Sequence, residues 1–346
     1  MIDTNSRNPL VSVVILNYNG NECLEKCLLS VFTTSYAPFE VIVVDNGSSD
    51  GSAERASEKW HFRLIKKQKN SGYSAGNNTG IRAARGSFVV LLNNDTIVDS
   101  DWLTELVGES QRSKADFCQP KIVIPGPSRI INSTGLTIHL AGFGLLRGNG
   151  EPDNGQYDEQ KNVCGFHGAC IFASKNAIER TGLLDEVFFA YNEDTDWSWR
   201  ALMMGLKTVY VPSAIVYHSY GTTRKLVTPR RISYAERNRL IMLLTNYSRR
   251  SLILLLPALA VTEIATLAYC LSNRILSAKI LGYADLLRLR SYTKSRSTWI
   301  QARRVVKDRD IFGMFEARFS HPFFGTFSKP LNSIYTFWFR LVASFM

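Results

Sequence analysis

The sequence predicts an α/β protein: a mostly parallel β-sheet flanked by helices, followed by a helical second part. Residues 88–92 and several other short runs are apolar without polar alternation, which is typical of strands buried on both faces. Segments with helical spacing lie between these runs, and the connections are short enough for one parallel sheet. An excess of basic and aromatic residues after position 223 distinguishes the second part.

The expected strands and helices follow from two patterns, the uninterrupted apolar runs and the helical spacing of apolar residues. Strands are expected where apolar residues run together, at 11–16, 39–44, 62–65, 88–92, 209–211 and 214–217, with partial alternation over 130–140. Helices are expected where apolar residues recur at helical spacing, at 22–32, from about residue 52, through 81–84, from residue 101 and at 193–204. The polar segment 70–80 is expected to lead into the third helix.

Asn, Asp, Ser and Gly follow three of the predicted strands, at 17–20, 45–51 and 93–96. In open α/β sheets, ligands bind beyond the carboxyl ends of the strands. A dinucleotide-binding fold would need Gly-x-Gly-x-x-Gly straight after the first strand, where this chain has Asn-Tyr-Asn-Gly. These segments therefore predict a different polar ligand, and the carboxylate of Asp95, with two amides beside it, is suited to a divalent cation. Ordinary turns are the alternative.

The charge is divided unevenly along the chain. Residues 1–223 contain 20 Lys and Arg against 24 Asp and Glu, whereas residues 224–310 contain 18 against 5. This excess predicts an anionic partner for the second part, either nucleic acid or a membrane surface. The aromatic residues of 312–346 lie among Leu, Val and Ile, and no nucleic-acid motif is recognisable, which favours the membrane.

Residues 252–271 form a mostly apolar run that reaches the length of a transmembrane helix. Pro257 would kink it, and Glu263 near its middle would cost roughly 2.5–3.5 kcal/mol on insertion scales. An interfacial or re-entrant hydrophobic hairpin is therefore favoured over a span, and a buried helix packed on the first part is the alternative. Residues 280–306 are expected to form a basic amphipathic helix or a helix pair.

Residues that carry a family resemblance occur in unbroken order over about 11–246, in the segments 13–19, 43–51, 70–78, 91–95, 168–170, 192–196, 199–200 and 217–218. They resemble the family 2 glycosyltransferases, most of all the rhamnosyltransferase-like branch. Each segment is weak alone, and together they are highly specific. The resemblance implies a GT-A (Rossmann-like) catalytic domain at 1–246, which leaves 247–346 as a membrane-associating helical region.

The resemblance also implies a nucleotide-sugar donor, with the nucleotide base at the end of the second strand. Asp45 lies there, and a carboxylate can accept a hydrogen bond from N3–H of uracil or thymine, so a UDP- or dTDP-sugar is expected. The expected donor-binding residues are Asn17, Asn19, Asp45, Asn70, Gly72, Asn77, Asn93 and Asn94. An Asx turn at Asp45 and a flexible loop around Asn70 and Gly72 are the structural alternatives.

The segment 93–95 stands where the family has its Asp-x-Asp motif, and its first Asp is Asn93 here. One carboxylate fewer should weaken metal binding, so Asp95 is the expected ligand and Asn93 a donor contact. A His at the position of His218 joins the metal shell in related enzymes, and a structural role is the alternative. A mixed imidazole and carboxylate site suits Mn²⁺ at least as well as Mg²⁺.

Asp194 is the general base that the resemblance implies, with Glu193 as its helper. Simple placement of acidic residues at a helix start is the alternative. Asp196 is the fallback for the base, and His167 is a further candidate of lower rank. One base without a nucleophile predicts a single displacement with inversion.

The sequence thus predicts an inverting, metal-assisted hexosyltransferase, with rhamnose as one candidate sugar and a lipid-linked or polysaccharide acceptor. We expect it at the cytoplasmic face of the cell membrane, peripheral or monotopic, with no nucleic-acid partner. The six cysteines show no paired metal spacing and are expected to be reduced cytosolic thiols. The alternative function is a non-catalytic sugar-nucleotide-binding or membrane scaffold protein of the same fold.

Overall fold

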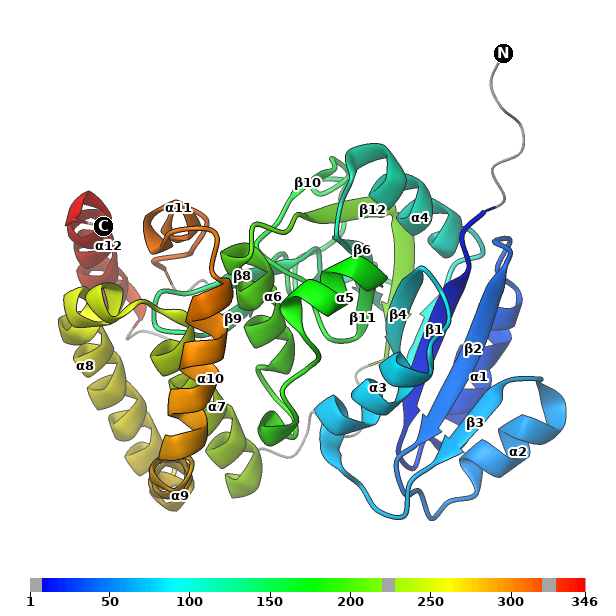
Figure 1. Cartoon of the computed structure of the whole chain (residues 1–346), viewed down its shortest axis with the longest axis horizontal. Helices are drawn as coiled ribbons and strands as arrows, with labels where there is room; N and C mark the ends of the chain where they lie inside the picture. The colour runs from blue at the N-terminus through cyan, green and yellow to red at the C-terminus, as the bar shows by residue number, and fades with distance from the viewer. Residues whose placement is uncertain (1–7, 220–227, 319–327, 346) are drawn as a thin grey trace. The chain divides into compact units, whose positions relative to one another are not determined.

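The computed structural model describes residues 8–219, 228–318 and 328–345. The chain divides into two compact units (Figure 1). The first unit consists of residues 1–135, 146–189 and 206–223, and the second unit consists of residues 136–145, 190–205 and 224–346. These bounds do not follow the boundary proposed at residue 246, which stays a prediction about domains.

A ten-stranded sheet forms the centre of the first unit. One half is parallel, in the order β4 (Phe88–Asn93), β1 (Val11–Asn17), β2 (Phe39–Asp45) and β3 (Arg63–Lys66). The connecting helices are α1 (Asn21–Phe32), α2 (Ser52–Lys59) and α3 (Gly72–Ala83). The predicted alternation of strands and helices is confirmed in this half of the sheet.

The other half of the sheet is mixed. Its central strands are β11 (Cys170–Ser174), antiparallel to β4 and β6, then β6 (Phe117–Ile124), and β12 (Thr208–His218), parallel to β6. The short strands β5 (Thr96–Val98), β7 (Ile130–Ser133) and β10 (Lys161–Asn162) complete it. The strands predicted at 209–211 and 214–217 are one strand, β12, whose register shifts between Val211 and Ile215.

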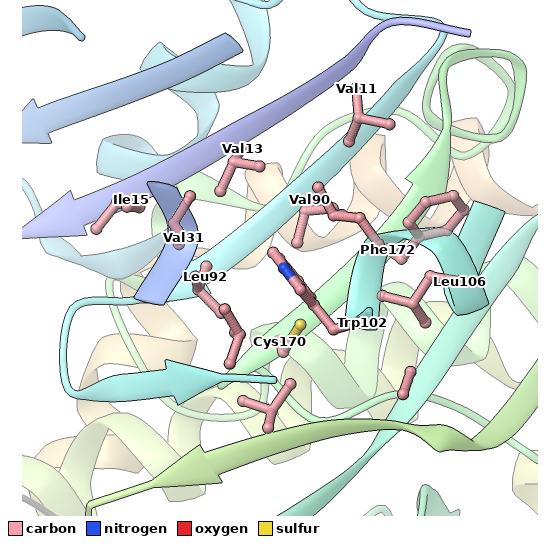
Figure 2. Close-up of a cluster of buried hydrophobic side chains, with 14 of the residues drawn as sticks. Val11, Val13, Ile15, Val31, Val90, Leu92, Trp102, Leu106, Cys170 and Phe172 are labelled. Carbon is pink, nitrogen blue, oxygen red and sulfur yellow. The ribbon is translucent and has the colours of Figure 1, made fainter. Parts of the chain in front are cut away.

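The core of the first unit lies between this sheet and the helices α1 and α4 (Trp102–Ser113). Figure 2 shows β1, β4 and β11 contributing alternate side chains to it, and Trp102 in its midst. A fully buried aliphatic or aromatic side chain contributes roughly 1.5–3 kcal/mol. The apolar runs of the sequence are therefore the main source of stability for the sheet. The helix α5 (Lys175–Thr181) and the 3₁₀ helix η1 (Glu186–Phe188) complete the first unit.

Helix α3 begins at Gly72, so the segment 70–80 is mostly helical and does not merely lead into a helix. Gly76 and Gly80, one turn apart on this helix, face the sheet. A Cβ atom at Gly76 would lie 2.4 Å from Leu16 Cδ1, and one at Gly80 would lie 2.2 Å from Val14 Cγ1. The glycines therefore allow α3 to lie directly on β1, a role that the Asn- and Gly-rich composition conceals.

The second unit is mainly helical. It contains α6 (Glu193–Met203), α7 (Pro229–Asn246), α8 (Arg249–Ser272), α9 (Leu276–Arg288), α10 (Arg290–Arg303), α11 (Asp308–Phe312) and α12 (Ser328–Phe345). Residues 130–140, predicted to alternate as a strand, contribute β7 to the first unit and β8 (Leu136–Ile138) to the second, where β8 pairs with β9 (Gly144–Leu146).

Two predictions for the second part can be compared with these helices. The hairpin expected within 252–271 is wrong, because α8 is one continuous helix of 24 residues with Pro257 inside it. Of the single amphipathic helix or helix pair expected at 280–306, the structure has the pair, α9 and α10. Among the described residues, α8 is the helix long and apolar enough to cross a membrane, and length and composition alone are weak evidence of a span.

Replacement of Gly80 by Ala should destabilise the first unit, because the new methyl group overlaps Val14, whose β-branched side chain has little room to move. Such overpacking costs about 1–3 kcal/mol. The matched control is Gly108→Ala in α4, where nothing lies within 4 Å of the new Cβ. That change should stabilise by about 0.5–1 kcal/mol. Urea unfolding of both variants measures the difference, and equal midpoints would contradict the close approach of α3 to β1.

Candidate functional site

Polar side chains meet where β1, β2 and β4 end, because these parallel strands are in register. Asn17 lies opposite Asp45, and Leu16 lies opposite Asn93. The amide nitrogen of Asn17 donates to Asp45 Oδ1 at 3.0 Å and to Ser52 Oγ at 2.9 Å. Its amide oxygen accepts from Asn94 Nδ2 at 2.9 Å. Asn17 is fully buried, so it acts as a bridge that orients Asp45 and Asn94.

The loop after β2 is held by side chains from two neighbouring segments. The backbone N–H of Ser48 donates to Asp45 Oδ2 at 3.3 Å, three residues on, whereas the Asx turn considered from the sequence would use the residue two positions on. Asn19, in the left-handed conformation at φ 50°, accepts from the backbone N–H of Ser49 at 2.9 Å. Each carboxylate oxygen of Asp45 thus accepts a hydrogen bond, Oδ1 from the amide of Asn17 and Oδ2 from the backbone of Ser48.

Asn46 connects this loop to the start of α3, and the sequence analysis did not assign it. Its amide nitrogen donates to Asn70 Oδ1 and to the Gly72 carbonyl, both at 3.1 Å. Gly72 has φ +86°, and a Cβ there would lie 2.4 Å from the Phe189 carbonyl oxygen. Asn77 is buried, and its amide nitrogen donates to the Tyr73 carbonyl one turn earlier. The only sign of this role in the sequence is that Asn46 directly follows Asp45.

Asp95 and His218 lie together at the other side of this edge. Strand β5 pairs antiparallel with the end of β12, which places Thr96 opposite His218. His218 Nε2 is 3.3 Å from Asp95 Oδ1, and both side chains are largely buried. His218 Nδ1 is 2.8 Å from Asn132 Oδ1, on β7. Asn132 is a second residue that the sequence did not indicate, because β7 is distant in the chain.

The contact with Asn132 determines how the imidazole of His218 is presented. An amide oxygen accepts a hydrogen bond, so Nδ1 carries the proton, and in the neutral ring the lone pair on Nε2 points to Asp95. A lone pair facing a carboxylate is unfavourable unless a cation or a proton lies between them. The two groups therefore fit a divalent cation, although the described residues contain no cluster of three or more His, Cys, Asp or Glu side chains that could hold one.

His167 lies beside this pair, with its ring centroid 5.8 Å from that of His218. Burial, and then the neighbouring His218, lower the pKa of His167 to about 3. Its Nδ1 has no hydrogen-bond partner among the described residues. His167 is therefore a neutral imidazole at physiological pH.

The three acidic residues at the start of α6 have different surroundings. Asp196 is fully buried, accepts from Arg200 Nε at 2.9 Å, and lies 2.5 Å from a guanidinium nitrogen of Arg296. Burial alone would raise the pKa of Asp196, but Arg296 and Arg200 outweigh it and hold the pKa below its usual range. Because its oxygens are already bonded to two arginines, Asp196 is a structural group and fits the fallback role of general base poorly.

Glu193 and Asp194 differ in exposure. Glu193 is buried, and burial first, then the charge of Asp194, raise its pKa. Its Oε2 has no hydrogen-bond partner among the described residues. Asp194 is only partly buried and accepts from the backbone N–H of Thr195 at 2.7 Å. Asp194 is thus the carboxylate of the three that remains reachable from outside the helix.

The sequence model described as Glycosyl transferase family 2 matches residues 12–188, just over half of the 346-residue chain. The chain belongs to glycosyl transferase family 2. The matched range contains the strand ends of β1, β2 and β4, with Asp45 and Asp95, and it stops before α6 and His218. The rhamnosyltransferase-like branch within the family stays a prediction.

Two relatives of this family 2 chain are named for the biosynthesis of O-antigen and of a glycan. It is 26% identical over 228 residues to an O-antigen biosynthesis protein of Myxococcus xanthus, covering 63% of this chain and 18% of that protein. It is 28% identical over 204 residues to the low-salt glycan biosynthesis hexosyltransferase of Haloferax volcanii, covering 55% of this chain and 61% of that protein. The chain thus spans less than two thirds of the length of each.

A solved structure of GalNAc-T7 with UDP, GalNAc and Mn²⁺ superposes with a TM-score of 0.58 at 16% identity. The superposition covers 71% of this family 2 chain and 49% of that one. At this level of identity the likeness concerns the fold, and it confirms the expected GT-A fold.

Replacement of Asp196 by Asn should destabilise the protein by about 3–5 kcal/mol, since Arg200 and Arg296 would keep their buried charges without the carboxylate. The lowered pKa of Asp196 means that its contribution is present above the unfolded pKa and is lost as the pH falls. The variant and the wild type should therefore converge in acid. Urea unfolding at several pH values measures this.

The matched control is Asp194→Asn, two residues earlier on the same helix. Asp194 is partly exposed, and it accepts hydrogen bonds from Thr195 on the same helix, so its replacement should change the free energy of unfolding by less than about 1 kcal/mol. Equal losses for the two variants would contradict the distinction between a structural Asp196 and a reachable Asp194.

Proposed function

We propose that this protein is a metal-dependent, inverting glycosyltransferase that moves a sugar from a nucleotide-sugar donor to a hydroxyl group of an acceptor. The observation that carries the proposal is the arrangement at the carboxyl edge of the parallel strands. Asp45 ends β2, and Asp95, with His218 Nε2 3.3 Å away, follows β4. Membership in glycosyl transferase family 2 supports the same reaction class.

The nucleotide would bind at the end of β2. A carboxylate there accepts a hydrogen bond from N3–H of uracil or thymine, so a UDP- or dTDP-sugar is the proposed donor. Asn17, Asn19 and Asn46 use their amides to fix the surrounding loops. The presence of UDP in the GalNAc-T7 structure supports a uridine nucleotide.

Asp95 and His218 would hold Mn²⁺ or Mg²⁺, with Asn132 orienting the imidazole. Such an ion would supply positive charge that stabilises the departing nucleotide diphosphate. Among the described residues, the proposed site offers one carboxylate and one imidazole, so the donor would have to contribute further ligands. We therefore expect tight metal binding only when the nucleotide is present. Mn²⁺ in the GalNAc-T7 structure agrees with this choice of metal.

Asp194 is the proposed general base. It would take the proton from the acceptor hydroxyl as that oxygen attacks the anomeric carbon, and a single displacement inverts the configuration. Its partial exposure at the start of α6 supports this role. Glu193, whose pKa is raised by burial and by Asp194, would be the neutral helper.

The acceptor would be a lipid-linked sugar or a growing polysaccharide, and the names of the two relatives support glycan assembly. A hexose, including rhamnose, is the proposed sugar. Such acceptors are held at membranes, so we place the protein at the cytoplasmic face of the cell membrane, peripheral or monotopic. The excess of basic residues in 224–310 supports an anionic surface as partner.

Donor hydrolysis should require a divalent metal, and Asp95→Ala should remove most of it. The direct readout is Mn²⁺ binding followed by electron paramagnetic resonance. UDP should tighten Mn²⁺ binding to the wild type and should fail to do so in Asp95→Ala and in His218→Ala. Asp101→Asn, an exposed carboxylate before α4, is the control and should behave as the wild type. Full activity in the presence of a chelator would sink the assigned roles of Asp95 and His218.

Asp194→Asn keeps the shape of the side chain and removes the base, so turnover should fall by about 10²–10⁴-fold. Affinity for the donor should hardly change, because the base acts on the acceptor. Glu193→Gln is the matched comparison, since an amide resembles the neutral acid, and it should retain most activity. Transfer assays with a full screen of nucleotide sugars measure both variants. An active Asp194→Asn beside an inactive Glu193→Gln would reverse the two roles.

A further inference from the structure

Helix α8 has the reverse of the polarity that a helix in water shows. Its buried positions follow one face, and four of the six carry a hydroxyl or thiol group: Ser251, Leu255, Ala258, Thr262, Thr266 and Cys270. Its exposed face is apolar, with Ile253 and Ile264 exposed by 66% and 68%, and Leu256 and Leu271 exposed to a similar extent. A helix on a soluble protein buries its apolar stripe and exposes polar residues.

The polar groups on the inner face of α8 are bonded within the second unit. Thr262 Oγ1 lies 2.8 Å from the hydroxyl of Tyr335 on α12, and Thr266 Oγ1 accepts from Lys279 Nζ at 2.7 Å. Ser251 donates to Asp308 at 2.5 Å. These three hydroxyl groups are therefore hydrogen-bonded to protein groups and do not depend on water, and these bonds fix the inward orientation of this face of α8.

Glu263, the one charge within the apolar run, is bonded on its flank. Its carboxylate is paired with Arg239 on α7 and lies 3.0 Å from Lys279 Nζ on α9, and Tyr283 donates to it. The charge that argued against a transmembrane span in the sequence is therefore paired with protein groups. The exposed apolar face of α8 therefore does not include the carboxylate of Glu263.

Helix α12, which packs against α8, also exposes apolar residues. Its exposed large residues recur at helical spacing, at Ile334, Phe337, Leu341 and Phe345. It packs on α8, where Trp338 Nε1 donates to the Leu254 carbonyl at 2.8 Å and Arg250 donates to the Phe345 carbonyl at 2.8 Å. Two adjacent helices thus expose apolar faces and keep their polar contacts to each other.

We propose that the outward faces of α8 and α12 insert side-on into one leaflet of an anionic lipid bilayer. This surface, the lipid face, consists of Ile253, Leu256, Ile264, Leu271, Ile334, Phe337, Leu341 and Phe345. The proposal deepens the membrane location proposed above and rests on it.

The charges at the margins favour lipid over a second copy of the chain. Arg249 and Arg250 stand exposed at one end of α8, Arg274 follows its other end, and Arg340 lies on α12. These cations would meet anionic headgroups while the apolar side chains enter the acyl region. A symmetric contact between two copies would bring arginines at both ends of α8 against each other.

The helix would lie along the surface because its inner face is attached to charged neighbours. Arg239 on α7 and Lys279 on α9 are bonded to Glu263 near the middle of α8. A span would carry both cations to the centre of the bilayer, where charged groups are costly. Insertion of one face only leaves them on the protein side.

Flotation of the full chain with vesicles tests the proposal. The wild type should bind vesicles of phosphatidylcholine with phosphatidylglycerol, and it should bind phosphatidylcholine alone more weakly. The variant Ile264→Glu with Phe337→Glu should lose at least tenfold of the bound fraction. The matched control is Leu29→Glu on α1, where an apolar side chain is exposed by 56% on the first unit, and it should bind as the wild type does. Unchanged binding by the double variant overturns the proposal.

A second measurement distinguishes side-on insertion from a span. Cys23 is exposed and the other native cysteines are buried, so Ile264→Cys in a Cys23→Ser background gives one accessible labelling position. A fluorophore there should be quenched by lipids brominated near the headgroup more than by lipids brominated near the chain end. The opposite order would show a span and overturn the proposal.

Gel filtration and donor hydrolysis separate the remaining outcomes. Loss of a dimer in the double variant, with no vesicle binding by the wild type, would assign the face to self-association and overturn the lipid proposal. Hydrolysis of a soluble nucleotide sugar should be the same in the wild type, the double variant and the control. Failure of hydrolysis in all three would count against the proposed function and would leave the vesicle result to decide the lipid face.

Discussion

The parallel register of β4, β1 and β2 is the constraint on which the first unit depends. Strands in register end at the same level, so the residues that follow them have to share one edge of the sheet. Asn17 makes this edge continuous, because its single amide bonds to Asp45, Ser52 and Asn94. The polar residues there form one hydrogen-bonded layer, and none of the loops is positioned independently of the others.

The glycines of α3 help to position this polar edge of the sheet, because they determine how closely the helix approaches it. Gly76 and Gly80 bring the helix onto β1, and Gly72 allows the chain to pass against the Phe189 carbonyl. Asn46 then connects the start of this helix to the loop after β2. The glycines therefore allow two things at once: α3 packs closely on β1, and the start of the helix reaches the polar layer.

In the second unit, buried ion pairs hold the helices together. Asp196 pairs with Arg296, a residue 100 positions later, and Glu263 is paired with Arg239 and Lys279. Both clusters join segments on the two sides of residue 246, where the sequence suggested a boundary. A buried carboxylate without its cation would be strongly destabilising. These pairs therefore bind the helices of 229–303 to α6 and make them parts of one folding unit.

The sequence by itself indicated the strands β1 to β4 and β12, the family, and Asp45, Asp95 and Asp194 as candidate site residues, but it did not indicate the central strands β6 and β11. Apolar runs and polar strand ends are local patterns, and local patterns can be read from residues close together in the chain. The assignment of Asp95 beside His218 also followed from the motif. What the motif did not contain was Asn132, which orients the imidazole from a strand that no local signal connects to it.

Only the tertiary structure decided which polar groups are structural and which surface is apolar. Asp194 and Asp196 look alike in the sequence, and they differ because the distant Arg296 joins Arg200 around Asp196, whereas Asp194 is partly exposed. Glu263 stands in the sequence as an unpaired charge within an apolar run, and in the structure it is paired with Arg239 and Lys279. The physical reason is the same in each case: a charge is neutralised by whichever partner lies near it in space, and the chain brings that partner from far away.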